Sequence, residues 1–152
     1  MQDMDRVIDV ALEMKNVKFI GLHFHIGSQI LDMGDFVALC NRVNELLDKL
    51  EARQIRIEHV NVGGGLGIDY GHPNRQPVPD FKSYFETYDN CLKLRSYQTL
   101  HFELGRSVVG QCGSLIAKVL YVKQGTNKQF AILDAGMTDL DFVPHSTRHS
   151  IR

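Results

Sequence analysis

Three segments of the chain combine glycine with side chains that can bind anions or transfer protons. They are Gly21–Gln29 (GLHFHIGSQ), Asn61–Tyr70 (NVGGGLGIDY) and Glu103–Arg106 (ELGR). Glycine loses more backbone entropy on folding than any other residue, so three in a row indicate a close approach of the backbone to a partner. Phosphate is a common partner, because amides without side chains can surround an anion. The segments together predict one composite anion site.

The remaining side chains of these segments indicate what else the site binds. A hydroxyl at Ser28 and a guanidinium at Arg106 suit an anion, and Glu103 and His25 add a carboxylate and an imidazole. A phosphorylated aromatic cofactor would use all of these groups. Pyridoxal phosphate needs its phosphate fixed, its ring packed and an anionic partner on its pyridinium nitrogen, which keeps the ring able to accept electrons.

A metal site is the alternative that the histidines leave open. His23 and His25 are two residues apart on a predicted strand, so their side chains share one face, and His101 and Glu103 repeat that spacing. Histidines on a barrel strand, joined by a further histidine, could bind zinc in a metal-dependent hydrolase. A metal centre would not need the glycines or the arginine, so we expect no metal ligands here.

The elements that must position these residues alternate between strand and helix. Strands are predicted over 18–26, 57–62 and 99–104, and each candidate segment lies at the end of one of them. Helices are predicted up to residue 14, from an N-cap at Asp35 to about Arg53, and from about Asp80 to Leu94. This alternation predicts parallel βα units of an α/β fold, with the functional residues at the carboxyl ends of the strands.

The pattern changes after Arg106. Ser114–Lys123 and Gln129–Leu133 read as two strands joined by the turn Gly125–Lys128, with no helix between them. We therefore expect a parallel, barrel-like part over 1–106 and an antiparallel β part over 107–140.

Composition excludes several classes of protein. The chain has 152 residues, 43% of them hydrophobic, and a net charge of −1, which offers no footprint for nucleic acid or an anionic membrane. No stretch approaches the roughly 18 apolar residues of a membrane span. Cys40, Cys91 and Cys112 are too few and too scattered for a disulfide framework. We expect reduced, core or half-buried thiols in a cytoplasmic protein.

From about residue 17 to Leu140 the chain resembles the diaminopimelate decarboxylases, pyridoxal-phosphate enzymes of the alanine racemase-like barrel class. The combination of GLHFHIGSQ, NVGGGLGI and ELGR carries the resemblance, and DAGMTDL at 134–140 adds to it. The resemblance implies the C-terminal part of a TIM-type (β/α)8 barrel, about three βα units, followed by the first strands of a β domain. It implies that the whole enzyme converts meso-diaminopimelate to L-lysine and CO2 in lysine biosynthesis.

The resemblance also implies a role for each candidate residue. His25 would stack on the cofactor ring, Glu103 would pair with the pyridine nitrogen, and Arg106 would serve the substrate carboxylate as well as the cofactor. The hydroxyl of Ser28 and the backbone at the glycines would hold the phosphate. The implied cofactor-binding set is His25, Ser28, Gly63, Gly64, Gly65, Glu103, Gly105 and Arg106.

Parts of the family pattern are missing. The lysine that forms the Schiff base belongs to an earlier barrel strand, and Lys15 and Lys18 lie in no such motif, so we expect no catalytic residue here and an inactive fragment. The segment 141–152 has no resemblance to the family. With suitable codons, a shifted reading frame there would restore the family's Arg-Pro-Ala-Leu-Tyr stretch, so we expect a frameshifted, disordered tail.

Two further alternatives stay open within this interpretation. The enzyme could be a related decarboxylase of arginine, ornithine or carboxynorspermidine, because substrate choice depends on segments outside this chain. It could also be a non-catalytic homologue that binds pyridoxal phosphate. Relatives are homodimers that act on a small amino acid, so we expect the same of the full-length protein.

Overall fold

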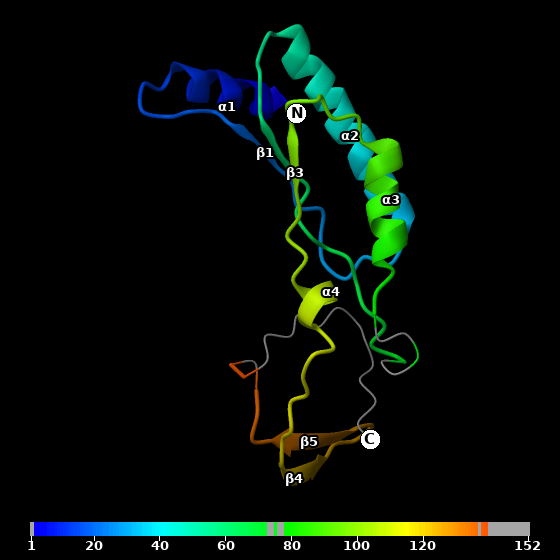
Figure 1. Cartoon of the computed structure of the whole chain (residues 1–152). Coiled ribbons are helices and arrows are strands. Elements are labelled where there is room, and N and C mark those ends of the chain that lie inside the picture. The colour runs from blue at the N-terminus through cyan, green and yellow to red at the C-terminus, as the bar shows by residue number, and fades with distance from the viewer. Residues whose placement is uncertain (1, 73–74, 76–77, 137, 140–152) are drawn as a thin grey trace.

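The computed structural model describes residues 2–72, 75, 78–136 and 138–139. The expected tail at 141–152 lies outside these residues. Figure 1 shows helices α1 and α2 flanking the first strands and a separate strand pair late in the chain. The elements are α1 (Gln2–Glu13), β1 (Gly21–His23), α2 (Met33–Ala52), β2 (His59–Asn61), α3 (Phe81–Cys91), β3 (Thr99–His101), α4 (Arg106–Val109), β4 (Val119–Gln124) and β5 (Gln129–Leu133).

Strands β1, β2 and β3 form a parallel sheet in that order, which confirms the predicted βα alternation. Leu22 pairs with Val60, and Val60 with Leu100; in the next row His23 pairs with Asn61, and Asn61 pairs with His101. Because successive side chains of a strand point to opposite faces, these two rows lie on opposite faces of the sheet. One face is apolar and the other carries the histidines.

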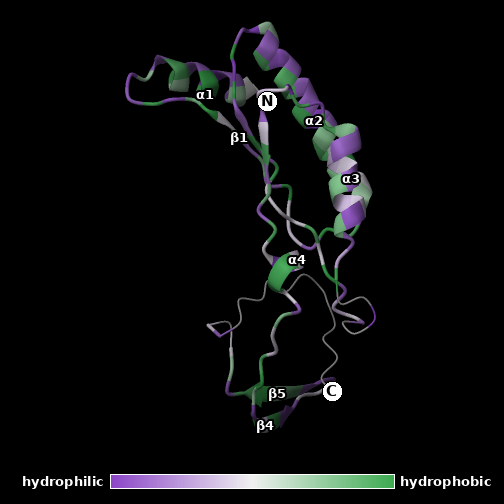
Figure 2. Cartoon of the chain, viewed as in Figure 1, coloured by the Kyte–Doolittle hydropathy of each residue, from purple (hydrophilic) through white to green (hydrophobic). Residues whose placement is uncertain are grey.

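The apolar face of the sheet packs on α2 and α3. Val60 and Val62 are fully buried together with Phe36 of α2 and Tyr84 of α3, whose rings meet edge to face at 4.9 Å. Figure 2 shows hydrophilic and hydrophobic residues on both of these helices, as amphipathic helices over a core require. The helices therefore cover one face of the sheet and leave the polar face to the candidate site.

The predicted ends of the elements needed correction. The N-cap of α2 is Asp32, whose carboxylate accepts a hydrogen bond from the Gly34 amide at 2.8 Å, and the predicted N-cap Asp35 lies inside the first turn. Both aspartates suit a helix start, and only the local backbone decides between them. Asp80 caps α3, which begins where predicted and ends at Cys91, before the predicted Leu94. Each strand of the parallel sheet is three residues long, shorter than predicted, because regular pairing ends where the loops begin.

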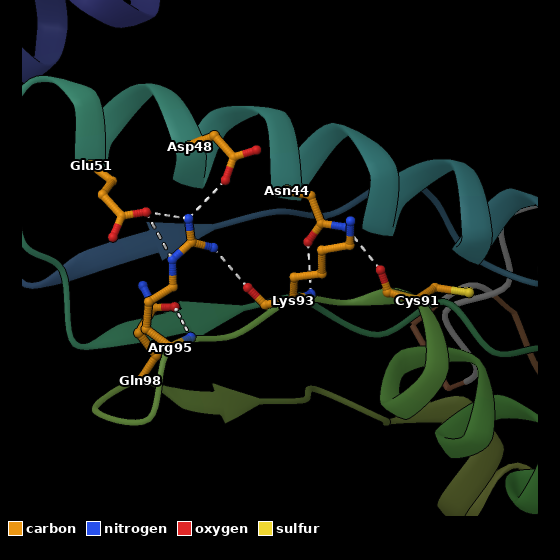
Figure 3. A network of polar contacts seen from close by, with 7 residues as sticks. All are labelled: Asn44, Asp48, Glu51, Cys91, Lys93, Arg95 and Gln98. Atoms are coloured by element: carbon orange, nitrogen blue, oxygen red, sulfur yellow. Dashed lines mark hydrogen bonds and ion pairs between the residues drawn. The ribbon is translucent and has the colours of Figure 1, made fainter.

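A polar network fastens the α3–β3 connection to α2 (Figure 3). The Arg95 guanidinium donates to Asp48 at 2.7 Å, to Glu51 at 2.5 Å and to the Lys93 carbonyl at 2.8 Å. The Asn44 amide donates to the Cys91 carbonyl and accepts from the Lys93 amide, both at 2.8 Å. These bonds fix where β3 begins, and with it the segment that leads to Glu103.

The second strand pair confirms the predicted hairpin. β4 and β5 are antiparallel, and the Gly125 amide donates to the Lys128 carbonyl across the turn. β4 begins at Val119 instead of the predicted Ser114, and the short helix α4 was not predicted. Every residue of β4 is exposed, including Val119 and Tyr121. The pair has no core of its own.

The three cysteines are free, as predicted. Cys40 is buried and Cys91 is half-buried, but Cys112 is exposed, so the expectation of core or half-buried thiols was wrong for Cys112. Burial raises the pKa of the Cys40 thiol to about 11. Among the residues that the structure describes, no helix is long and apolar enough to cross a membrane.

Arg95→Ala should lower the free energy of unfolding by about 1–3 kcal/mol, because it removes the hydrogen bonds of the guanidinium to three partners and leaves two carboxylates without their cation. Urea denaturation of the protein at its full natural length measures this. Lys82→Ala is the control: Lys82 is exposed and faces Glu86 at 3.8 Å, so its loss should cost less than about 0.5 kcal/mol. Equal effects of the two substitutions would contradict the structural role of Arg95.

Cys112 should react with a thiol reagent at neutral pH far faster than Cys40. The thiolate is the reactive form, and Cys40 is both inaccessible and held protonated. Mass spectrometry after timed labelling would separate the two positions. If Cys40 in the native protein were labelled as fast as Cys112, the burial of Cys40 would be refuted.

Candidate functional site

The three candidate segments continue beyond the carboxyl edge of the sheet and stay paired there. The Phe24 amide donates to the Asn61 carbonyl, and the Glu103 amide donates to the Gly63 carbonyl at 2.7 Å. His25, Gly63 and Glu103 therefore form the next row on the polar face, two residues beyond His23, Asn61 and His101. The structure brings together the residues that the sequence predicted for the ring of the cofactor.

Glycines 63–65 allow the middle segment to run against its two neighbours. A Cβ at Gly63 would lie 2.3 Å from the Phe24 carbonyl oxygen, one at Gly64 would lie 2.2 Å from that of Glu103, and one at Gly65 would lie 2.6 Å from that of Gly27. No side chain fits at these distances. Gly63 and Gly65 also have φ angles of +72° and +103°, which favour glycine.

The structure thus adds a reason for the glycines that the sequence did not suggest, because their backbone packs against two neighbouring segments. The contact with a phosphate, which the sequence suggested, stays a prediction. The Gly63 amide also has a partner within the protein, the Asn61 Oδ1 at 2.8 Å. A Cβ at Gly63 would also lie 3.1 Å from Nδ1 of the His25 ring, so the segment packs closely there as well.

Glu103 is held by two side chains from the other two strands. Asn61 Nδ2 donates to Oε1 at 2.9 Å, and His23 Nε2 lies 3.2 Å from Oε2. Both side chains of the Glu103–His23 pair are about half exposed. Carboxylate oxygens accept more than one hydrogen bond each, so Glu103 keeps capacity for a further donor. The carboxylate is oriented before any ligand arrives.

Ser28 lies next to a set of hydrogen bonds that joins the first and second segments. The Ile30 amide donates to the Gly65 carbonyl at 2.8 Å, and the Gly67 amide donates to the Ile30 carbonyl at 2.9 Å. The side chain of Gln29 adds two bonds to the backbone of Ile68, one donated and one accepted. Ser28 itself is exposed, and the backbone of its neighbour Gly27 packs on Gly65.

Arg106 lies at the start of α4, just after Gly105. Its Nη1 donates to the hydroxyl of Tyr70 at 2.8 Å, and its guanidinium carbon lies 5.7 Å from the centre of the Tyr70 ring. Tyr70 follows the glycine segment, so this bond links the second and third candidate segments. A Cβ at Gly105 would meet nothing within 4 Å, so the backbone there faces open space.

The histidines of the metal alternative do not converge. His101 Nε2 lies 2.9 Å from His59 Nδ1, whereas His23 is bound to Glu103. In the part of the chain that the structure describes, no group of three or more histidine, cysteine, aspartate or glutamate side chains could hold a metal ion. His59, a position for which the sequence suggested no role, is half-buried against His101.

Asp69 shapes the loop after the glycines. Its Oδ1 accepts from the amides of Gly71 and His72, and the bond from the His72 amide lowers the pKa of the carboxyl. A cavity of about 300 Å³ lies beside this loop, lined in part by Leu66, Ile68 and Pro79. None of the predicted cofactor residues lines it, so it is separate from the candidate site.

Sequence reasoning missed three residues that hold the site together: Asn61, Gln29 and Tyr70. Asn61 could have been found, because it stands two residues before Gly63 and two residues are the period of a strand face. Gln29 and Tyr70 act across loops whose mutual approach no local pattern specifies. His23 was noticed only as a metal ligand, and the structure gives it Glu103 as its partner.

Most of the chain is similar to known proteins. Residues 1–110 match the sequence model of the pyridoxal-dependent decarboxylases, pyridoxal binding domain. The match covers more than half of the chain, and the chain belongs to this family.

Within the family the chain is similar to diaminopimelate decarboxylases. It is 89% identical over 140 residues to that of Bacteroides thetaiotaomicron, which covers 92% of this chain and 36% of the relative. Identity to the Neisseria meningitidis serogroup B enzyme is 41%, over 86% of this chain and 30% of the relative. The crystal structure of the Helicobacter pylori enzyme complexed with L-lysine matches with a TM-score of 0.71 and 33% identity, over 91% of this chain and 34% of that one. The chain spans about a third of the length of these relatives.

Gly64→Ala should disrupt the site, because the new Cβ would collide with the backbone at Glu103 and force two segments apart. We expect a loss of about 1–3 kcal/mol in the free energy of unfolding of the full-length protein, or failure to fold. Gly113→Ala is the matched control, since a Cβ there meets nothing within 4 Å. If both variants were as stable as the wild type, the close packing of the glycine segment would be refuted.

Proposed function

We propose that the protein carrying this chain is a diaminopimelate decarboxylase that uses pyridoxal phosphate and converts meso-diaminopimelate to L-lysine and CO2. Support for the cofactor comes from one arrangement, in which His25 and Glu103 stand on either side of Gly63 in one row of the polar face. Support for the substrate comes from the similarity to diaminopimelate decarboxylases, one of which is 89% identical in sequence over 140 residues.

The residues present fit this cofactor. A pyridoxal ring needs an anion at its nitrogen, a flat neighbour and no side chain in between, and Glu103, His25 and Gly63 have these properties in one row. When bound, pyridoxal phosphate supplies an electron sink for the carbanion left when CO2 departs. Glu103 would hold the proton on the ring nitrogen, and His25 would pack on the ring.

The phosphate would bind where the three segments end. Ser28 would donate its hydroxyl, and backbone amides of the glycine segment and of Gly105 would contribute further donors. Since the Gly63 amide donates to Asn61, we assign the phosphate-binding amides of this segment to Gly64 and Gly65, and Gly63 would pack the segment against Phe24. Arg106, oriented by Tyr70, would bind the substrate carboxylate close to the phosphate.

The rest of the protein would complete the fold. We propose that residues 1–106 belong to the C-terminal part of a (β/α)8 barrel and 107–140 to the start of a β domain. The parallel sheet with helices on one face supports the first assignment, and the exposed apolar residues of β4 and β5 support the second. Exposed side chains on α1, among them Val7 and Leu12, also need a cover. We further propose a cytoplasmic homodimer.

Two experiments on the protein at its full natural length test the function. Purified protein should gain the near-ultraviolet and visible absorbance of bound pyridoxal phosphate and release CO2 from meso-diaminopimelate, but not from arginine or ornithine. Glu103→Gln should lower kcat by about 100-fold or more, because a neutral amide does not hold the ring nitrogen protonated. Glu58→Gln, an exposed residue just before β2, is the control and should leave kcat unchanged.

The outcomes separate the alternatives. Faster release of CO2 from ornithine or arginine would assign the protein to a related decarboxylase. Binding of pyridoxal phosphate without release of CO2 from any of these amino acids would indicate a non-catalytic homologue. Absence of binding would overturn the proposal as a whole.

A further inference from the structure

Asn61 is the one side chain that touches both the glycine segment and the candidate ring-nitrogen carboxylate among the contacts that the structure describes. Its Oδ1 accepts from the Gly63 amide at 2.8 Å, and its Nδ2 donates to Glu103 Oε1 at 2.9 Å. Asn61 ends β2, the central strand, so it stands between His23 and His101 in register. Its own position is therefore fixed by the sheet on both sides.

The first of these bonds fixes which end of the amide faces Glu103. Because the Gly63 amide can only donate, it selects Oδ1, and the NH2 group must then point the other way. The Asn61 NH2 group is therefore oriented toward Glu103 before a ligand binds, and binding does not have to restrict the rotation of the Asn61 side chain. The hydrogen bond from the Gly63 amide thus determines that Asn61 is the donor in its contact with Glu103.

The second bond acts on the direction of Glu103. Asn61 Nδ2 contacts Oε1 of the carboxylate, and His23 contacts the other oxygen, Oε2. A glutamate side chain held at one oxygen alone can still swing about its terminal bond. Held at both, it presents its remaining acceptor capacity in one direction.

We propose that Asn61 is a positioning residue, which keeps the carboxylate of Glu103 aimed at the ring nitrogen of the cofactor. The proposal rests on the function proposed above for Glu103. It assigns to Asn61 no contact with substrate or cofactor. Its effect on ligand binding should therefore depend on the presence of a ring nitrogen.

The substitution Asn61→Asp isolates this effect. The carboxylate of an aspartate can still accept from the Gly63 amide, but it places a second acidic oxygen against Glu103. Two carboxylates at hydrogen-bond distance share a proton, which competes with the proton on the ring nitrogen. Asn61→Ser is a second variant, because its hydroxyl can accept from Gly63 but is too short to reach Glu103.

Asn44→Asp is the matched control. Asn44 makes the same pair of bonds, one accepted from the Lys93 amide and one donated to the Cys91 carbonyl, in the network of Figure 3. It lies on α2, on the side of the sheet away from the polar face. Its substitution repeats the chemical change without touching Glu103.

The test measures the dissociation constants of pyridoxal phosphate and of its 1-deaza analogue, in which carbon replaces the ring nitrogen, with full-length apoprotein. We expect Asn61→Asp and Asn61→Ser to weaken pyridoxal phosphate by about tenfold or more and the analogue by less than about threefold. Asn44→Asp should leave the dissociation constants of both ligands unchanged. Equal weakening of both ligands, or none, would overturn the role of Asn61. If the wild type bound pyridoxal phosphate no better than the analogue, the proposed role of Glu103 would fail, and that of Asn61 with it; failure to bind either ligand would overturn the proposed function as well.

Discussion

Close backbone contact at Gly63, Gly64 and Gly65 is the constraint on which the candidate site depends. Each of these glycines lies against a carbonyl oxygen of a neighbouring segment, at distances that exclude a Cβ. The contacts bring the ends of β1 and β3 to both sides of β2 and carry the strand register beyond the sheet. His25 and Glu103 stand on either side of Gly63 because the segment between them packs closely against both neighbouring segments.

The division of the sheet into two faces separates stability from chemistry. Val60 and Val62 point into the core with Phe36 and Tyr84, while the alternating positions carry His59, Asn61 and Gly63. Burial of the apolar face provides the hydrophobic stabilisation, and the polar face is free to hold groups that a core would not tolerate. On that face the described polar side chains hold one another: Asn61 and His23 contact Glu103, and His59 contacts His101. These pairings fix the direction of the groups that would meet a cofactor.

Much of this arrangement could be predicted from the sequence, because it follows from local patterns. The three segments end strands, and strands separated by helices are parallel, so His25, Gly63 and Glu103 had to meet at one edge. The order of the elements and the hairpin at Gly125–Lys128 follow in the same way. The choice of Asp32 over Asp35 as N-cap could not be predicted, since both residues have the same chemistry and the backbone decides.

The backbone contacts of the glycines and the partners of Glu103 could not be predicted from the sequence either. A glycine run indicates a close approach but does not say to what, and here the neighbours are other parts of the same backbone. The contacts of Arg106 with Tyr70 and of Gln29 with Ile68 join residues that are far apart in the chain, 36 and 39 positions respectively. Such pairs depend on how the loops fold over one another, which periodicity does not describe.

The most direct test of the central claim is a crystal structure of the full-length protein with pyridoxal phosphate. The distance to measure is that from the Glu103 carboxylate to the ring nitrogen. We predict a charge-assisted hydrogen bond of about 2.7–2.9 Å, with the cofactor ring over Gly63 and beside His25. A ring bound elsewhere, or a ring nitrogen that faces a group other than Glu103, would contradict the account.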